Sequence, residues 1–457
     1  MGPGRGTLRG KLAPSPNFFE EMNQDQVSPG TPDEANDGAR GARSRGPGEL
    51  TDPTVAPLRI GLMLRAIDDV DGQGIYIRKL CDALFAMDTQ NQYVALYWHE
   101  HQTGRYRHLP NVREVVVRGG NKLLWDQLLV PHAARREALD VLFHHKFSIP
   151  LAAPCPTVVQ QRGTEYWTHP EFYTGWAGRL DRSYNRLMIP LYCRRAVRVL
   201  TNSDTLGDEL VRFAGVPRSK LRTVYASADE SFRPVTDSAA LARTRERYRL
   251  PAEPYLLMVV KGHQIQGQAS RGVLTPRKNV ALALEAYGRM RERAAVAGRA
   301  APPLVILGIG IAERLTDEVV AKSTEPSAVH TPGFVEFGDM PALYTMARGL
   351  VFPSRYESFG IPIIEAMACG CPVVTSTTSA CPEVAGGAGL LVDPDDGEGL
   401  ASAMERLSFE DRLVQDLRAR GFRRAADFSW TDSAHILLSE FRAAASARAS
   451  RVASTEE

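Results

Sequence analysis

The feature that most constrains the fold is a repeated alternation of short apolar runs, rich in β-branched residues, with longer amphipathic patterns. The segments IYIRKLCDALFAM (75–87), TLGDELVRFAG (205–215) and NVALALEAYGRM (279–290) are typical of helices. Strands that alternate with helices predict a parallel sheet wrapped by helices. The predicted strands form two series: 58–64, 93–98, 113–117, 141–144, 157–161, 198–203 and 221–227, then 255–261, 303–308, 349–354, 372–376 and 390–393.

A polar stretch at about 235–253 separates the two series and is typical of a linker with a short helix. We therefore predict two Rossmann-like α/β domains, whose ligands bind beyond the carboxyl ends of the strands. Two such domains facing each other form an interdomain cleft, a common position for a substrate site. The predicted segments are a disordered N-terminal tail without hydrophobic periodicity (1–56), an N-terminal domain (57–245), a C-terminal domain (246–428), and a final helix with a short tail (429–457).

Composition excludes several classes of protein. The chain has 55 basic and 53 acidic residues, so its net charge of +2 lacks the basic excess of a nucleic-acid-binding protein. No apolar run approaches the ~20 residues of a membrane span, and the N-terminus lacks the apolar region of a signal peptide. The six cysteines form no CxxC pair, which favours buried free thiols over disulfides or a zinc site. These features predict a cytoplasmic protein, either free or peripheral at the inner face of the membrane.

The stretch SRYESFGIPIIEAMACGCPVV carries two carboxylates, Glu357 and Glu365, on either side of a predicted helix start. The helix should begin near Pro362, because proline is favoured at the first helical position, and should stop at Gly370. The N–H groups of a helix N-terminus suit a phosphate, and carboxylates accept hydrogen bonds from vicinal hydroxyls. The corner therefore suits a nucleotide-sugar; the alternative is two solvated glutamates. The backbone amides predicted to contact the ligand are those of Ser358, Phe359, Gly360 and Ile361.

The segment from VHTPGFV to LLVD (329–393) resembles the retaining glycosyltransferases of family 4, group 1. That family has the GT-B fold, in which two Rossmann-like α/β domains face an interdomain cleft. The resemblance implies that the N-terminal domain binds the acceptor, that the C-terminal domain binds the nucleotide-sugar, and that the final helix crosses back. Weaker likenesses extend over residues 58–445 and include GQGIYIRKLCDAL (72–84), VRVLTNSDTLGDEL (197–210), VYASADESFRP (224–234), TPRKNVALALEAY (275–287) and FSWTDSA (428–434).

The resemblance also implies roles for the two acids. Glu357 is expected to act as a catalytic residue that contacts the donor sugar and the developing charge. Glu365 is expected to bind the ribose hydroxyls of the nucleotide.

Further positions would hold the diphosphate leaving group. Lys278, with Arg277 or Arg271, is expected to neutralise it, because a departing diphosphate needs cationic or N–H stabilisation. Gly72 and Gly74 are expected to form a loop of the N-terminal domain facing the same group. No DxD-type acidic pair stands out in the expected place, so no metal site and no cofactor are predicted.

Three features depart from the family pattern. Arg162 stands where relatives usually carry a histidine; arginine cannot act as a base, but it can stabilise an oxyanion or bind an acidic acceptor, so we count it as catalytic. The segment 263–274 is longer than the loop usual at this position, and Ser227 replaces a common glycine. His144 and His145, at the end of a predicted strand, are structural histidines or a substitute base.

The segment 175–199 mixes aromatic residues with six arginines. It is typical of a basic amphipathic helix on an anionic membrane, although a solvated helix face or contact with an anionic acceptor explains it equally well.

These features predict a metal-independent retaining hexosyltransferase. It would move a mannose- or glucose-type hexose from a GDP- or UDP-linked donor to a hydroxyl of a glycan, glycolipid or small metabolite. The predicted partners are the nucleotide-sugar and the hydroxyl acceptor, with peripheral contact to a membrane or lipid-linked acceptor, and no nucleic acid. The alternative is a catalytically weak binding or partner subunit with the same fold.

Overall fold

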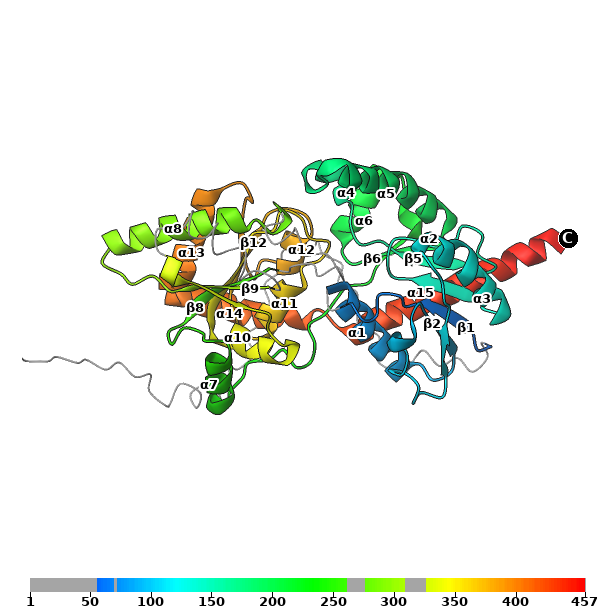
Figure 1. The fold of residues 1–457 in the computed structure, drawn as a ribbon, viewed down its shortest axis with the longest axis horizontal. Coiled ribbons are helices and arrows are strands. Elements are labelled where there is room, and N and C mark those ends of the chain that lie inside the picture. The colour runs from blue at the N-terminus through cyan, green and yellow to red at the C-terminus, as the bar shows by residue number, and fades with distance from the viewer. Residues whose placement is uncertain (1–55, 70–71, 261–275, 309–325, 457) are drawn as a thin grey trace, which may run out of the picture. The chain divides into compact units, whose positions relative to one another are not determined.

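The computed structural model describes residues 56–69, 72–260, 276–308 and 326–456 (Figure 1). Within it, Pro57–Glu457 form one compact unit. Two separate parallel sheets organise this unit, as the sequence predicts. We call the part built on the first sheet the first lobe and the part built on the second sheet the second lobe.

The first sheet has seven strands in the order β3-β2-β1-β4-β5-β6-β7, and every pair is parallel. Both faces of the sheet are covered, because successive residues of β2 enter different apolar clusters: Val94 and Leu96 in one, Tyr93 and Ala95 in the other. The strands are β1 (Arg59–Met63), β2 (Gln92–Tyr97), β3 (Val112–Val116), β4 (Val141–His144), β5 (Thr157–Gln160), β6 (Arg198–Thr201) and β7 (Leu221–Thr223).

The second sheet has six parallel strands in the order β10-β9-β8-β11-β12-β13. It is also covered on both faces, because Leu256 and Met258 of β8 join one cluster while Tyr255 and Leu257 join another. The strands are β8 (Tyr255–Val259), β9 (Leu304–Leu307), β10 (Val329–Gly333), β11 (Ala347–Phe352), β12 (Val373–Ser376) and β13 (Leu390–Val392).

Helices connect the strands of both sheets (Figure 1). Those of the first lobe are α1 (Gly72–Met87), α2 (Lys122–Leu124), the π-helical turn η4 (Trp125–Leu129), α3 (Val130–Arg136), α4 (Glu165–Thr168), α5 (Gly175–Arg195) and α6 (Asp204–Ala214). The next are α7 (Ser238–Arg247), α8 (Val280–Val296), α10 (Met340–Met346), α11 (Ile361–Ala368), α12 (Cys381–Ala385), α13 (Gly397–Phe409), α14 (Asp411–Ala426) and α15 (Trp430–Glu456). Short 3₁₀ turns are η3 (Glu100–Gln102), η5 (Pro170–Phe172), η6 (Arg218–Lys220), η7 (Pro276–Lys278), η8 (Pro326–Ala328) and η9 (Phe337–Asp339).

The last helix, α15, follows the second lobe in the chain but packs against α1, β4 and β5 of the first lobe. The Phe441 ring contacts the Phe143 ring of β4, with centroids 5.5 Å apart. Glu440 pairs with Arg198 and Arg222, at 2.8 and 3.1 Å. The two lobes are therefore joined by this helix as well as by the chain around α7.

The prediction of free cysteines is confirmed, since all six are buried and unpaired with one another. Burial raises the pKa of the Cys193 and Cys371 thiols to about 12, so both thiols stay protonated. Among the residues that the structure describes, none of the helices combines the length and the apolar character needed to cross a bilayer.

Candidate functional site

Each sheet has one position where the strand order reverses: between β1 and β4 in the first, and between β8 and β11 in the second. Open parallel sheets bind ligands beyond the carboxyl ends of their strands at this position. In the second lobe, β11 ends at the loop 353–360. The next described element after β8 is η7, and the residues 261–275 before it lie outside the described part. In the first lobe β4 runs directly into His145.

Glu357 and Lys278 form an ion pair beside the end of β11. The Nζ of Lys278 lies 2.5 Å from the Oε1 of Glu357, and the two side chains are only 17% and 15% exposed. The same Nζ lies 4.7 Å from the centroid of the Phe352 ring, within cation–π range. The Glu357 amide donates to the Ser379 hydroxyl at 2.8 Å, which fixes the loop. A positive and a negative group thus stand side by side where the second sheet ends.

The backbone of η7 is tied to the same loop. The carbonyl of Arg277 accepts a hydrogen bond from the amide of Arg355 at 2.8 Å. The Asn279 side chain donates to the carbonyls of Pro353 and Pro394, at 3.2 and 2.6 Å. Asn279 has a φ of 56°, a left-handed conformation that asparagine tolerates better than most residues. These bonds position Arg277 and Lys278 against the carboxyl edge of the sheet.

The Arg277 side chain reaches the first lobe, where it pairs with Glu165 of α4. Its guanidinium also lies over the rings of Phe172 and Tyr356, 5.6 and 5.8 Å from their centroids. Burial lowers the pKa of Arg277, but the charges of Glu165 and Glu357 outweigh it and the net shift is upward. Arg277 therefore stays charged, and both predicted phosphate-binding cations, Arg277 and Lys278, already have a carboxylate partner.

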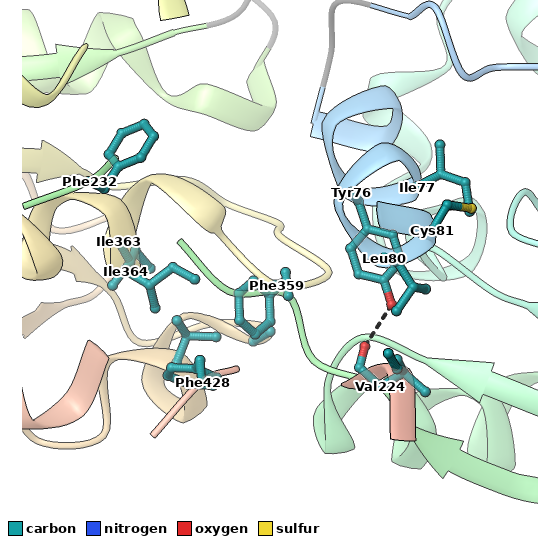
Figure 2. Close-up of a cluster of buried hydrophobic side chains, with 14 of the residues drawn as sticks. Tyr76, Ile77, Leu80, Cys81, Val224, Phe232, Phe359, Ile363, Ile364 and Phe428 are labelled. Atoms are coloured by element: carbon teal, nitrogen blue, oxygen red, sulfur yellow. Dashed lines mark hydrogen bonds between the residues drawn. The ribbon is translucent and has the colours of Figure 1, made fainter. Parts of the chain in front are cut away.

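Helix α11 begins at Ile361, one residue before Pro362. Pro362 has no N–H and the Ile363 amide donates to the Gly360 carbonyl at 2.9 Å, so of these three positions only Ile361 keeps an amide without an acceptor in the helix. Gly360 precedes it with a φ of 97°, which favours glycine. The Phe359 side chain is buried and packs against the Phe428 ring (Figure 2). It also contacts the Tyr225 ring. Phe359 can therefore offer a ligand only its backbone, and the role predicted for its amide stays a prediction.

The other two polar residues of this corner are held by side chains. The Ser358 hydroxyl accepts a hydrogen bond from the Asn202 side chain of the first lobe at 3.0 Å. Glu365 is buried, and the Tyr344 hydroxyl donates to its Oε2 at 3.1 Å. Burial raises the pKa of Tyr344 far above its ordinary value, and the charge of Glu365 adds to the shift, so Tyr344 remains a donor.

Gly72 and Gly74 lie in the first turn of α1, not in a loop as the sequence suggests. The predicted helix, 75–87, misses the first turn of α1, because glycine has no side chain that could add to the apolar pattern. A Cβ on Gly74 would meet the carbonyl oxygen of Asp69 at 1.8 Å, so this position requires glycine. A Cβ on Gly72 would meet only Ile361, at 3.9 Å, which brings the start of α1 close to the start of α11.

Arg162 is buried over the Tyr76 ring, with its guanidinium carbon 4.1 Å from the centroid. The Tyr76 hydroxyl donates to the Val224 carbonyl at 2.9 Å (Figure 2) and accepts from Gln160 at 2.7 Å. Burial lowers the pKa of Arg162 to about 10, which leaves it charged at neutral pH. Its Nε and Nη2 have no hydrogen-bond partner among the described residues. A buried cation with unused donors is chemically suited to an anionic group.

His144 and His145 are fully buried at the end of β4. Burial lowers the pKa of both imidazoles well below the ordinary value, and the charges of Arg65 and Arg162 add to the effect. His144 also contacts the Ser148 carbonyl through Nδ1. Both rings are therefore neutral at neutral pH and are weak bases.

Sequence reasoning missed a hydrogen-bond network that joins the lobes. The Tyr356 hydroxyl donates to Glu209 at 3.0 Å and accepts from the Thr164 amide at 2.8 Å. The Thr164 hydroxyl also donates to Glu209, at 2.5 Å. Burial raises the pKa of Glu209, and these two donors counteract part of that shift. No spacing in the sequence could reveal these contacts. The one available signal is that Thr164 and Tyr356 are close in sequence to the predicted site residues Arg162 and Glu357.

Glu383 of α12 makes a second contact between the lobes. Its carboxylate accepts from the amides of Asp204 and Thr205, at 2.8 and 2.9 Å, and from the Thr205 hydroxyl at 2.6 Å. These amides begin α6, so a carboxylate of the second lobe caps a helix of the first. The Tyr225 hydroxyl donates to the same carboxylate at 3.0 Å.

Arg271 and the extended segment 263–274 lie outside the described residues. Within the described ranges, no three His, Cys, Asp or Glu side chains are grouped so that they could hold a metal ion.

Two family models match the chain. One, described as Glycosyltransferase Family 4, matches residues 70–232, and the other, described as Glycosyl transferases group 1, matches residues 269–409. Together they cover more than half of the chain.

Solved structures share the arrangement of both lobes. Sucrose-phosphate synthase from Thermosynechococcus elongatus superposes with a TM-score of 0.65 at 19% identity, over 84% of this chain and 98% of its own. Anabaena HepE, solved in complex with UDP and glucose, gives a TM-score of 0.63 at 15% identity, over 84% of this chain and 100% of its own. The fold is therefore the GT-B fold.

The chain belongs to the group 1 glycosyltransferases of family 4. Among curated proteins it is 31% identical to O-antigen chain mannosyltransferase B of Escherichia coli over 233 residues, which is 51% of this chain and 57% of that protein. It is 27% identical to D-inositol 3-phosphate glycosyltransferase of Thermobifida fusca (strain YX) over 257 residues, 54% of this chain and 55% of that protein. The chain thus spans little more than half the length of these curated relatives.

Proposed function

We propose that the protein is a retaining hexosyltransferase that moves a mannose- or glucose-type sugar from a nucleotide-sugar to a hydroxyl acceptor. The observation that carries the proposal is the pair of Lys278 and Glu357 at the carboxyl edge of the second sheet, beside Arg277 and the start of α11. A cation, a carboxylate and first-turn amides are the groups that a sugar diphosphate needs. A mannose donor is favoured by the mannosyltransferase relative and a UDP-linked donor by the HepE complex.

In this proposal the bond between the anomeric carbon and the diphosphate oxygen breaks as the acceptor oxygen forms its bond from the same face. The acceptor proton passes to the departing phosphate oxygen, so no protein base is needed. Lys278 and Arg277 stabilise the negative charge that develops on the diphosphate. Glu357 faces the positive charge that develops at the anomeric carbon. No metal ion or cofactor takes part, because the two cations supply the charge.

The remaining residues position the substrates. Glu365, oriented by Tyr344, would accept hydrogen bonds from the ribose hydroxyls. Arg162 is too strongly charged to act as a base, but its unused donors would bind an anionic group of the acceptor or stabilise an oxyanion. The acceptor is a hydroxyl of a glycan, glycolipid or small metabolite.

The test combines donor binding with turnover. The purified full chain is titrated with GDP-mannose, UDP-glucose and the free nucleotides by calorimetry, and nucleotide release is followed with acceptor hydroxyls. Glu365→Gln should weaken donor binding by about 10–100-fold, the cost of one or two hydrogen bonds to a charged group. Glu357→Ala should retain binding and lose about 100-fold or more in turnover. Exposed Glu253→Gln serves as the control and should change neither.

A binding or partner subunit with the same fold is the second candidate. It is favoured by Arg162 at the position of the usual histidine and by the carboxylate partners that Arg277 and Lys278 already have. Tight donor binding without turnover on any acceptor would support this candidate. Absence of nucleotide-sugar binding would contradict both.

A further inference from the structure

The outer face of α5 carries an unusual row of exposed apolar side chains. Trp176 is 77% exposed, Leu187 is 72% exposed and Leu180 is 62% exposed, and Tyr184 and Leu191 are also exposed. These residues recur every three or four positions and so form one stripe along the helix. The core-facing side of α5 is a different one, formed by Ile189, Tyr192 and Cys193. The helix is therefore apolar on two faces, and only one of them is covered by the part of the protein that the structure describes.

A second group of exposed apolar side chains lies on α2 and η4: Leu123, Leu124 and Leu128. The loop at Leu151 connects this group with α5, because its amide donates to Gln127 of η4 at 2.9 Å and its carbonyl accepts from Arg195 of α5 at 2.7 Å. Both elements belong to the first lobe (Figure 1). We call the combined surface the α5–η4 patch: Leu123, Leu124, Leu128, Trp176, Leu180, Tyr184, Leu187 and Leu191. It holds more than half of the exposed large apolar side chains among the described residues.

The charges around the stripe are strongly biased. Helix α5 contains five arginines and a single acid, Asp181. Arg179 and Arg186 are exposed along one border of the stripe, and Arg194 and Arg195 are exposed at its end. An exposed apolar stripe bordered by arginines, with a tryptophan and a tyrosine, is the composition of a helix that lies in the interface of an anionic bilayer. At about 30 Å, a helix of 21 residues is long enough for such a contact to involve many lipids.

A second copy of the chain is a poorer occupant of this surface. A two-fold interface places the same patch of both copies face to face, so the arginine borders would oppose each other. An anionic lipid surface instead complements them. We propose that the α5–η4 patch docks the protein on the surface of an anionic phospholipid bilayer, with the stripe in the boundary between headgroups and acyl chains.

The proposal is tested with the full chain and with vesicles, in the absence of substrates, so the result is independent of the proposed activity. Wild-type protein should float with vesicles of phosphatidylcholine and phosphatidylglycerol and should bind pure phosphatidylcholine vesicles at least about tenfold less. Leu180→Asp/Leu187→Asp should lower the partition coefficient by about 100-fold, because each leucine loses its apolar contact with the bilayer. Val296→Asp, a change of an exposed apolar residue in the second lobe, should bind like wild type.

A charge-reversal pair separates the electrostatic part. Arg179→Glu/Arg186→Glu should weaken binding to anionic vesicles by about tenfold or more. The control is Arg412→Glu/Arg423→Glu on α14, which changes the net charge by the same amount and should have little effect. Vesicles that contain brominated lipids should quench the fluorescence of Trp176 in the wild-type protein. In Trp176→Phe this loss of fluorescence should be absent.

Three results would overturn the proposal. One is a wild-type protein that does not bind anionic vesicles. Another is binding that survives Leu180→Asp/Leu187→Asp in a protein whose circular dichroism and melting match those of wild type. The third is a dimer, detected by sedimentation, that the same variant dissociates while vesicle binding is absent, since the patch would then be an interface between copies.

Discussion

Two fully buried imidazoles, His144 and His145, lie where β4 reaches the candidate site. The groups that face them are mostly cationic: Arg65, Lys122 and His145 act on His144, and Arg162, Lys146 and Arg65 act on His145. Carbonyl oxygens of Ser148 and Met63 oppose these charges only in part. The folded state therefore keeps both rings neutral at a pH where the unfolded chain, with ordinary histidines, binds protons.

This difference makes stability depend on pH. Because the folded-state pKa of each histidine is lowered, its contribution to stability is fully present above about pH 6.5 and is lost as the pH falls below that value. Between pH 7.5 and 5.5 we expect a loss on the order of 1 kcal/mol in the free energy of unfolding for each histidine that stays neutral. Urea denaturation at the two pH values measures the loss. In His144→Gln the pH-dependent loss in the free energy of unfolding should be smaller than in wild type by the share of one histidine.

The comparison uses the change between the two pH values and not the absolute stability, since His144→Gln also alters packing. Exposed His132→Gln provides the control and should leave the pH-dependent loss as in wild type. An undiminished loss in His144→Gln would show that His144 titrates alike in the folded and unfolded states.

The start of α1 illustrates how a helix and a loop constrain each other. The Arg78 guanidinium donates to the carbonyls of Ile67 and Asp69, so the loop before α1 cannot easily move away. Gly74→Ala places a Cβ 1.8 Å from the Asp69 oxygen and should lower the free energy of unfolding by about 1–3 kcal/mol. Gly72→Ala meets only a side chain at 3.9 Å and should change it by less than about 0.5 kcal/mol.

Both variants are compared by chemical denaturation under the same conditions. Equal effects of the two substitutions would contradict this account of Gly74. The sequence alone shows two glycines in equivalent positions of one motif, and only the position of Asp69 separates them.

The cap of α6 is an element-scale contact between the lobes. Glu383→Ala removes a carboxylate that accepts from two amides and two hydroxyls, and it should lower the free energy of unfolding by about 2–3 kcal/mol. Glu383→Gln keeps one acceptor oxygen and should cost less. Exposed Glu253→Ala is the control. If Glu383→Ala were no more destabilising than this control, the cap would contribute nothing in solution.

Most strands could be predicted because a buried parallel strand is a short apolar run, as in LVIL of β9 and VLFH of β4. β10 escaped prediction because VHTPG is only partly buried and contains a proline. The helix start at Ile361 followed from its glycine and proline. These are local signals, and each is contained in a few neighbouring residues.

The contacts within the candidate site could not be predicted in the same way. Arg277 and Glu165 are 112 positions apart, and Glu383 and Asp204 are 179 apart. Such pairs depend on how the two sheets and their loops meet, which no local pattern encodes. The residue pattern singled out Glu357 and Glu365, and the resemblance to a known family added Lys278 and the expected roles. Neither gave the partners of these side chains or the burial of Arg162.

At the scale of the whole molecule, α15 connects the end of the second lobe to the first. The Trp430 ring contacts the Tyr76 ring, with centroids 5.3 Å apart. The Ser433 hydroxyl donates to the carbonyl of Tyr225 at 2.7 Å, and the Ser227 hydroxyl donates to that of Phe428 at 2.8 Å. The Ser227 side chain thus connects the first lobe to the start of the crossover.

Phe441→Ala tests whether α15 is part of the cooperative structure of the first lobe. Phe441 is fully buried against Phe143, so its truncation should cost about 3–5 kcal/mol, whereas half-exposed Phe422→Ala on α14 should cost less. Amide hydrogen exchange should accelerate in β4 and β5 as well as in α15, because the helix packs on both strands. Faster exchange confined to α15 would mean that the helix unfolds alone and that the first sheet is stable without it.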